Sequence, residues 1–302
     1  MNTFDFQGYI SNRKNPEERA KSLTFGDYAF RGDIKWLRTL TTLVPVRLMV
    51  GATMQLWSGW GRKEVLADAV RASEKDASRL LEVSNEAARA LHMAPIPVYL
   101  THHLKEVPAQ ALGDDEETFI AVHTGAVREM SDPQLTFVIG RQLGHAQNGH
   151  VIYQTAAFYV DEIANVVVRW AVAPGQVALN QWRRRAAITA DRAGLLACRS
   201  LEVAGRQIID EAIALERLEK DVDVDAFVKA LEADGGKAGF FDKLTLKAPA
   251  VSIRLAALRA FSETQYYFDH IGKRSTEGRS MAEVDDEVEA VLRDGAGAPT
   301  SE

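Results

Sequence analysis

The chain has 302 residues, enough for one large domain or two small ones with a full hydrophobic core. Its 46% hydrophobic and 26% charged residues are typical of a globular protein, and the net charge of −6 argues against a nucleic-acid partner. The one cysteine, Cys198, excludes an internal disulfide. We interpret Cys198 as a small buried helical residue rather than a reactive thiol.

The N-terminal segment and the apolar stretches bear on where the chain resides. Residues 1–21 contain no apolar run of the signal-peptide type, which predicts a cytoplasmic protein. The stretches Leu40–Trp57 and Val151–Val172 are interrupted by charged residues, so neither predicts an integral membrane segment. A helix lying on a membrane surface remains an alternative for Leu40–Trp57.

The first part of the chain predicts helices followed by two strands. Asp33, Trp36, Leu37 and Leu40 fall at helical spacing, which predicts a helix there. Lys63–Met93 is predicted to be a long helical region with a break near Ser73–Ser78. Short apolar runs predict strands at Ile96–Leu100 and Phe119–Val122, joined by a loop. His102 and His103 fall in that loop, where we interpret them as part of a solvated turn rather than a metal site.

The helix on which the chain is organised begins after the second strand. Ser131-Asp132-Pro133 is a helix-start signal, because Ser or Asp caps free amides and Pro suits the first turn. A buried stripe follows at helical spacing, formed by Leu135, Val138, Ile139 and Leu143. Arg141 and His145 are four residues apart, so they share one face of this helix.

The second half of the chain is predicted to be helical. A helix over Val151–Trp170 is expected to close at Pro174-Gly175, and Arg183-Arg184-Arg185 is expected to be a solvated helix start. The further helices expected are Ala186–Ser200, Glu202–Glu219, Asp225–Ala233, one from Ala248 to Phe261, and an acidic helix over Met281–Leu292.

Three motifs together resemble metallopeptidase family 48, the gluzincins that include HtpX and the CAAX prenyl protease. The family reads H-E-L-G-H and then N-x-H, where this chain has Arg141-Gln142-Leu143-Gly144-His145, Asn148 and His150. The family's E-x-x-A-D-x-x-G is matched by Ala190–Gly194, and its closing H-P-x(4)-R-x(3)-L by Ala248–Leu258. The resemblance implies an α+β, mostly helical, zincin-like metallopeptidase domain with a small β-sheet.

The same resemblance places the domain within the chain. We predict an N-terminal extension over residues 1–27, the metallopeptidase-like domain over 28–272, and a polar, partly disordered tail over 273–302.

The chain departs from the family at its chemical positions. The places of the first zinc-binding histidine and of the zinc-binding glutamate are taken by Arg141 and Ala187. Gln142 replaces the general base, and an amide cannot accept and return a proton near neutral pH. His145 is the one retained ligand, and His150 is expected to point off its face. We therefore expect no zinc and no other cofactor.

Other residues around the expected site suggest how it is organised. The resemblance implies that the strand Phe119–Val122 is the open sheet edge along which a peptide lies, with Ile120, Val122 and His123 as candidate contacts. A plain strand-end role is the alternative for His123. In the family the aspartate at Asp191 orients the first histidine, so we predict an Arg141–Asp191 ion pair with two hydrogen bonds.

Three functions remain open from the sequence. The first is a pseudopeptidase that binds a protein or peptide through the remnant cleft. The second is an active zinc metalloendopeptidase with rearranged ligands, and the third is a different, metal-free activity in the same cleft. Asn148 and His150 are either remnants of a binding site or residues that cap and brace the helix. The sequence does not predict the partner or the oligomeric state.

Overall fold

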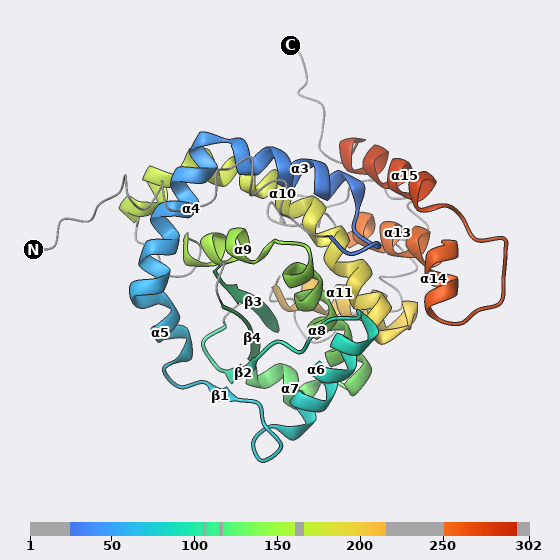
Figure 1. The fold of residues 1–302 in the computed structure, drawn as a ribbon, viewed down its shortest axis with the longest axis horizontal. Helices are drawn as coiled ribbons and strands as arrows, with labels where there is room; N and C mark the ends of the chain where they lie inside the picture. Colours follow the sequence, from blue (N-terminus) through green and yellow to red (C-terminus); the bar gives the residue numbers. More distant parts are fainter. Residues whose placement is uncertain (1–24, 105–106, 115–116, 161–165, 216–250, 295–302) are drawn as a thin grey trace, which may run out of the picture.

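The computed structural model describes residues 25–104, 107–114, 117–160, 166–215 and 251–294, and the account below concerns these residues. Most of them are helical, and the helices surround one small sheet (Figure 1). The α+β, mostly helical architecture predicted from the sequence is therefore confirmed. The helices are α3 (Arg31–Thr42), α4 (Val44–Leu56), the π-helical η1 (Trp57–Gly61), α5 (Arg62–Leu66), α6 (Ser78–Ala90), α7 (Thr124–Glu129), α8 (Asp132–Gln147), α9 (Val151–Phe158), α10 (Val166–Cys198), α11 (Leu201–Leu215), α13 (Val251–Ser262), α14 (Gln265–His270) and α15 (Met281–Asp294).

The sheet has four strands in the order β1-β2-β4-β3. Their bounds are β1 (Val70–Arg71), β2 (Val98–Thr101), β3 (Ala109–Gly113) and β4 (Thr118–His123). β4 runs parallel to β2 and antiparallel to β3, while β1 pairs antiparallel to β2. The two strands predicted from the sequence are β2 and β4, whereas β1 and β3 were missed.

The prediction that the strand Phe119–Val122 is an open edge of the sheet is wrong. β4 lies between β2 and β3, so Ile120 and Val122 are paired on both sides and fully buried. His123 at its end accepts a hydrogen bond from the backbone N–H of Gly125 and so caps α7, which leaves it the strand-end role. The edge strand next to β4 is instead β3, and its Ala and Gly residues give it too little strand propensity to be recognised from sequence.

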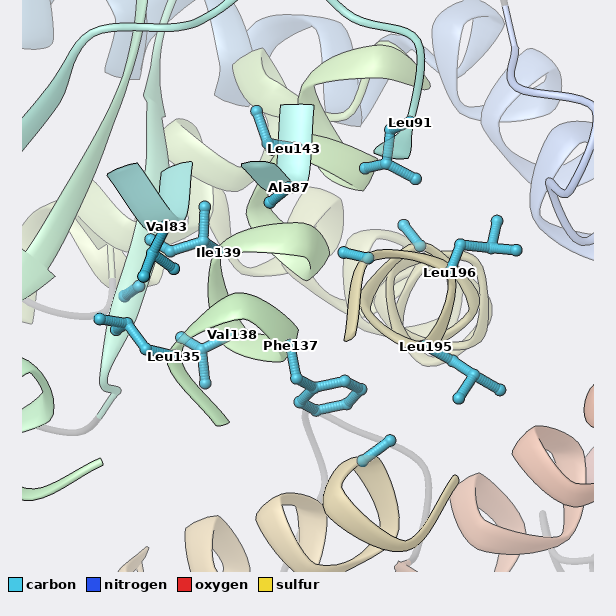
Figure 2. Packing of buried hydrophobic residues seen from close by; sticks show 14 of the residues in the cluster. Val83, Ala87, Leu91, Leu135, Phe137, Val138, Ile139, Leu143, Leu195 and Leu196 are labelled. Carbon is cyan, nitrogen blue, oxygen red and sulfur yellow. The ribbon is translucent and has the colours of Figure 1, made fainter. Parts of the chain in front are cut away.

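Helix α8 lies at the centre of the main core. Figure 2 shows its apolar side chains in one cluster with Val83 and Ala87 of α6 and with Leu91 just after that helix, while Leu195 and Leu196 come from α10. The predicted stripe of α8 is buried as expected, and its members are Leu135, Val138, Ile139 and Leu143. The start signal is also confirmed, because Ser131 and Gln134 form a reciprocal capping box with Pro133 in the first turn.

Helices α8 and α10 are packed so closely that their backbones nearly touch. A Cβ added at Gly140 would lie 2.6 Å from the Cβ of Ala197, and one added at Gly144 would lie 2.5 Å from the Cβ of Ala193. Any larger residue at either glycine would force the two helices apart. This contact brings the two family motifs, one on each helix, face to face.

The long helix α10 corrects two predictions. It runs from Val166 to Cys198, through Pro174-Gly175, where the helix was expected to close. Gly175 faces α4 at close range, because an added Cβ would lie 2.7 Å from the carbonyl oxygen of Pro45. This tertiary packing accounts for continuation past a local helix breaker. Arg185 lies mid-helix, buried, and pairs with Glu289, so Arg183-Arg184-Arg185 is not a helix start.

The acidic helix expected near the C-terminus is present as α15, and it packs onto the domain. Its buried side chains Val284, Val288 and Leu292 form a cluster with residues of α10 and α13 and with Phe30. A buried ion pair joins Arg192 of α10 to Asp285 at 2.7 Å. Packed structure therefore extends past the predicted domain boundary at residue 272.

The break in Lys63–Met93 is confirmed, but it contains strand β1 as well as a turn. No helix in the described ranges is long and apolar enough to cross a membrane. The helix expected over Asp225–Ala233 and the residues after 294 lie outside the described ranges.

Candidate functional site

Four charged side chains meet where α8, α10, α11 and α13 converge. Arg141 of α8 places its Nε 3.0 Å from Oδ1 of Asp191 on α10, and its Nη1 donates a 2.6 Å hydrogen bond to Oε2 of Glu211 on α11. Arg254 of α13 holds the other side of Asp191, with Nε 2.8 Å from Oδ2 and Nη2 2.7 Å from Oδ1. Two cations and two anions thus form a charge-balanced quartet.

The predicted Arg141–Asp191 ion pair is present, but the prediction that two hydrogen bonds join this pair is wrong. The Arg141 Nε contact with Asp191 lacks hydrogen-bond geometry. The two-fold, fork-to-carboxylate geometry belongs to Arg254 instead. Burial alone would lower the pKa of Arg254, but the Asp191 carboxylate beside it raises that pKa above its ordinary value. Arg254 is therefore the principal counter-ion of Asp191.

A hydrogen bond accepted by Gln142 connects the edge strand β3 to α8. The side chain of Gln142 is buried, and its Oε1 accepts a 2.9 Å hydrogen bond from the backbone N–H of Ala111 in β3. Two residues along the same strand, the N–H of Gly113 donates to the hydroxyl of Thr155 on α9 at 2.9 Å. Both N–H groups point away from β4, so they are donors that an added peptide strand would use. In this conformation side chains of the protein occupy them.

A second network of polar side chains extends from His145 into the core. The Nδ1 atoms of His145 and His150 are 3.0 Å apart, so one ring donates and the other accepts. His150 Nε2 lies 3.0 Å from Oδ2 of Asp33, off the line of a hydrogen bond. An N–H on Nε2 beside this carboxylate makes His150 Nδ1 the acceptor. His145 then donates from Nδ1, and its Nε2 faces the side-chain amide of Gln154 at 3.3 Å.

His145 is held neutral in this chain. Burial lowers its pKa well below the ordinary value, and the nearby positive charge of Arg141 lowers it further. The carboxylate at the other end is fully buried and receives hydrogen bonds from Trp182 Nε1 at 2.8 Å and the Thr189 hydroxyl at 2.6 Å. Each oxygen of the Asp33 side chain therefore accepts one hydrogen bond within the core.

The expectation that His150 points away from His145 is wrong. Gly149 adopts a positive φ of 70°, which reverses the chain after α8, and His150 then precedes α9. The backbone N–H of His150 also donates to the carbonyl of His145 at 3.1 Å, so the turn is closed. A helical projection extended past the end of the helix could not reveal this.

Asn148 braces the end of α8, as one interpretation of the sequence held. It is fully buried, and its Oδ1 accepts from the N–H of Gly26 at 2.9 Å while its Nδ2 donates to the Gly144 carbonyl at 2.7 Å. Nδ2 also lies 3.1 Å from the Tyr28 hydroxyl. Asn148 therefore closes the helix and holds the preceding N-terminal segment against it.

Sequence comparisons identify the family of this site. The family model described as peptidase family M48 matches residues 74–262, more than half of the chain. The chain belongs to peptidase family M48. Among curated M48 proteins it is similar to the plastoglobule-localized metallopeptidase 48, chloroplastic, of Arabidopsis thaliana, at 26% identity over 175 residues. That match covers 55% of this chain and 49% of the relative, so the chain spans about half of the relative's length. No solved structure matches the chain.

The M48 zinc site is a poor fit to the residues that stand in its place here. The expected ligand places hold a guanidinium at Arg141 and a methyl group at Ala187, neither of which donates an electron pair to a metal. The guanidinium is paired with two carboxylates, and a nearby dication would be repelled by it. Among the residues that the structure describes, His145 belongs to no His, Cys, Asp or Glu trio close enough to share an ion.

Sequence reasoning missed several members of this M48 site. Asp33, Gln154, Glu211 and Arg254 complete its two polar networks, and they come from four helices or their flanks. Arg254 could have been predicted from the sequence, because it occupies the arginine position of the closing motif and Asp191 is retained. Asp33, Gln154 and Glu211 carry no local signal, since each meets its partner only after the helices have packed.

Proposed function

We propose that this M48 protein is a catalytically inactive pseudopeptidase that acts as a protein- or peptide-binding module. The observation that carries the proposal is the Arg141 guanidinium, ion-paired to Asp191 and Glu211 where the family's first zinc ligand stands. Ion pairs between α8, α10 and α11 do there what a metal does in the enzymes, because they connect these helices. No zinc and no other cofactor is part of the proposal.

The loss of the base supports inactivity independently of the metal. Gln142 cannot take a proton from water near neutral pH, and its oxygen already accepts the N–H of Ala111. His145 is neutral, but its ring atoms face His150 and Gln154 in a buried network rather than an open site.

The mode of binding differs from the one the resemblance implied. An extended peptide cannot pair with β4, and the outward N–H groups of Ala111 and Gly113 on β3 are occupied. We therefore propose that the partner contacts side chains near the edge strand, where Gln110 is part-exposed, rather than adding a strand. The cytoplasmic location expected from the sequence stays a prediction.

Two measurements test this proposal. Untagged protein should leave casein and a peptide library intact, and chelator-sensitive cleavage that co-purifies with the chain would contradict inactivity. For binding, a photo-crosslinking residue at Gln110 should capture a discrete partner from the native host. The matched control places the same residue at exposed Glu74, in the turn before α6. Capture from Glu74 alone, or from neither position, would contradict the proposed surface.

The alternative of an active zinc endopeptidase with rearranged ligands makes the opposite prediction. It requires a stoichiometric metal bound through His145 and cleavage that depends on it. A metal-free activity in the same region, the third candidate, would instead survive chelation and be lost in variants of Arg141 or Asp191 that stay folded.

A further inference from the structure

A cluster of metal-ligating side chains lies outside the M48 site, at the opposite edge of the sheet. Asp68 lies in the link between α5 and β1, and His102 and His103 directly follow β2. β1 and β2 pair antiparallel with Val70 opposite Leu100, so continuing this register places Asp68 opposite His102. One ligand atom from each of the three side chains lies within 4.8 Å of the others.

The local geometry leaves one of these ligand atoms without a partner. His103 Nε2 is buried and has no hydrogen bond, although its side chain as a whole is 35% exposed. Asp68 Oδ2 lies 3.6 Å from it, beyond hydrogen-bond reach. A desolvated nitrogen without a partner is unfavourable, and a shared cation between the imidazole and the carboxylate would satisfy both.

The backbone of the turn is fixed while the ligand side chains remain accessible. The N–H of His103 donates to the hydroxyl of buried Thr101 at 3.2 Å, which anchors the turn to the end of β2. The His102 and His103 rings lie beside each other with centroids 4.3 Å apart. Both rings and the carboxylate thus lie close enough together to offer ligand atoms to one ion.

We propose that Asp68, His102 and His103 bind a divalent transition-metal ion of the Zn²⁺ class. Two imidazoles and one carboxylate suit Zn²⁺ and its borderline neighbours, whereas Mg²⁺ and Ca²⁺ prefer oxygen ligands. Three protein ligands leave at least one coordination position for water. The ion would join the segment before β1 to the end of β2, and because it binds the folded chain it would stabilise this edge of the sheet.

The proposal is tested with untagged, chelator-dialysed protein titrated with ZnCl₂ by calorimetry. One equivalent should bind, and Asp68→Asn or His103→Asn should weaken binding at least about tenfold. His92→Asn is the matched control, since His92 is an exposed histidine at φ 54° that lies outside the cluster and Asn tolerates that conformation. The control and His145→Gln should bind as the unaltered protein does.

A second readout identifies the ligands without relying on variants. Cu²⁺ added at one equivalent should give an electron paramagnetic resonance spectrum with couplings to two imidazole nitrogens. Absence of Zn²⁺ binding, binding unchanged in both cluster variants, or a Cu²⁺ spectrum without nitrogen coupling would overturn the proposal. Because the cluster shares no residue with the M48 site, these outcomes are independent of the proposed pseudopeptidase function.

Discussion

Arg141 Nε lies 3.0 Å from Oδ1 of Asp191, so a base and an acid connect the two helices whose counterparts share a zinc ion in M48 peptidases. Asp191 is nevertheless held more firmly by Arg254, which donates to both of its oxygens. The two arginines are therefore not equivalent, and their substitution separates their roles.

The first prediction concerns this inequality. Arg254→Ala should destabilise the fold by roughly 3–5 kcal/mol, because it removes both hydrogen bonds of a buried carboxylate. Arg141→Ala should cost less, about 1–3 kcal/mol, since Asp191 keeps Arg254 and the partly accessible Glu211 can recruit water. Urea unfolding measures both values.

The control for this pair is Arg128→Ala, which removes an exposed arginine at the end of α7 and should change stability by less than about 0.5 kcal/mol. Equal costs for Arg141→Ala and Arg254→Ala would contradict the assigned hierarchy.

The second prediction concerns pH. The pKa of His145 is lowered by burial, so below its unfolded pKa of about 6.5 the unfolded chain binds a proton that the folded chain does not. Stability should therefore fall as the pH falls from 7 towards 5, with a contribution of up to about 1.4 kcal/mol per pH unit from this group. His145→Gln should flatten the slope in urea unfolding, and an unchanged slope would show that His145 is not the group responsible.

The third prediction concerns Gln142 and the sheet edge. Gln142→Leu leaves the Ala111 N–H without its acceptor, so it should cost about 1–3 kcal/mol and speed hydrogen exchange at that amide. Gln142→Glu retains an acceptor oxygen and serves as the matched variant, with Ala111 exchange remaining slow. If the Ala111 amide is equally protected in Gln142→Leu, the side chain does not hold the strand.

The fourth prediction concerns rebuilding the M48 ligand set. Arg141→His, Gln142→Glu and Ala187→Glu restore the family residues, but Gln154 still faces His145 Nε2 at 3.3 Å. We expect the triple variant to bind Zn²⁺ weakly, and addition of Gln154→Ala to strengthen binding at least about tenfold. Calorimetry with both variants measures this, and equal affinities would show that Gln154 does not obstruct the ring.

The sequence predicted those features of the fold that depend on local pattern. The stripe and cap of α8 follow from periodicity and a start signal, the strands β2 and β4 follow from short apolar runs, and the acidic helix α15 was also expected. β3 was missed because small residues carry a weak strand signal, and the continuity of α10 was missed because packing against α4 overrides Pro174-Gly175.

The candidate site was predictable where the motifs align and not where the chain turns. The contact between Arg141 and Asp191 follows from two aligned signatures. The approach of His150 to His145 depends on the positive φ of Gly149, and the approach of Asp33 to His150 depends on the docking of α3. Tertiary geometry of this kind leaves no periodic trace in the sequence.

The central claim is that His145 no longer holds a metal, and the zinc content of purified protein tests it most directly. The measurement uses untagged protein carrying Asp68→Asn and His103→Asn, which removes the proposed separate site, with and without His145→Ala. The account predicts far less than one zinc per chain in both proteins. About one zinc per chain that disappears with His145→Ala would contradict it.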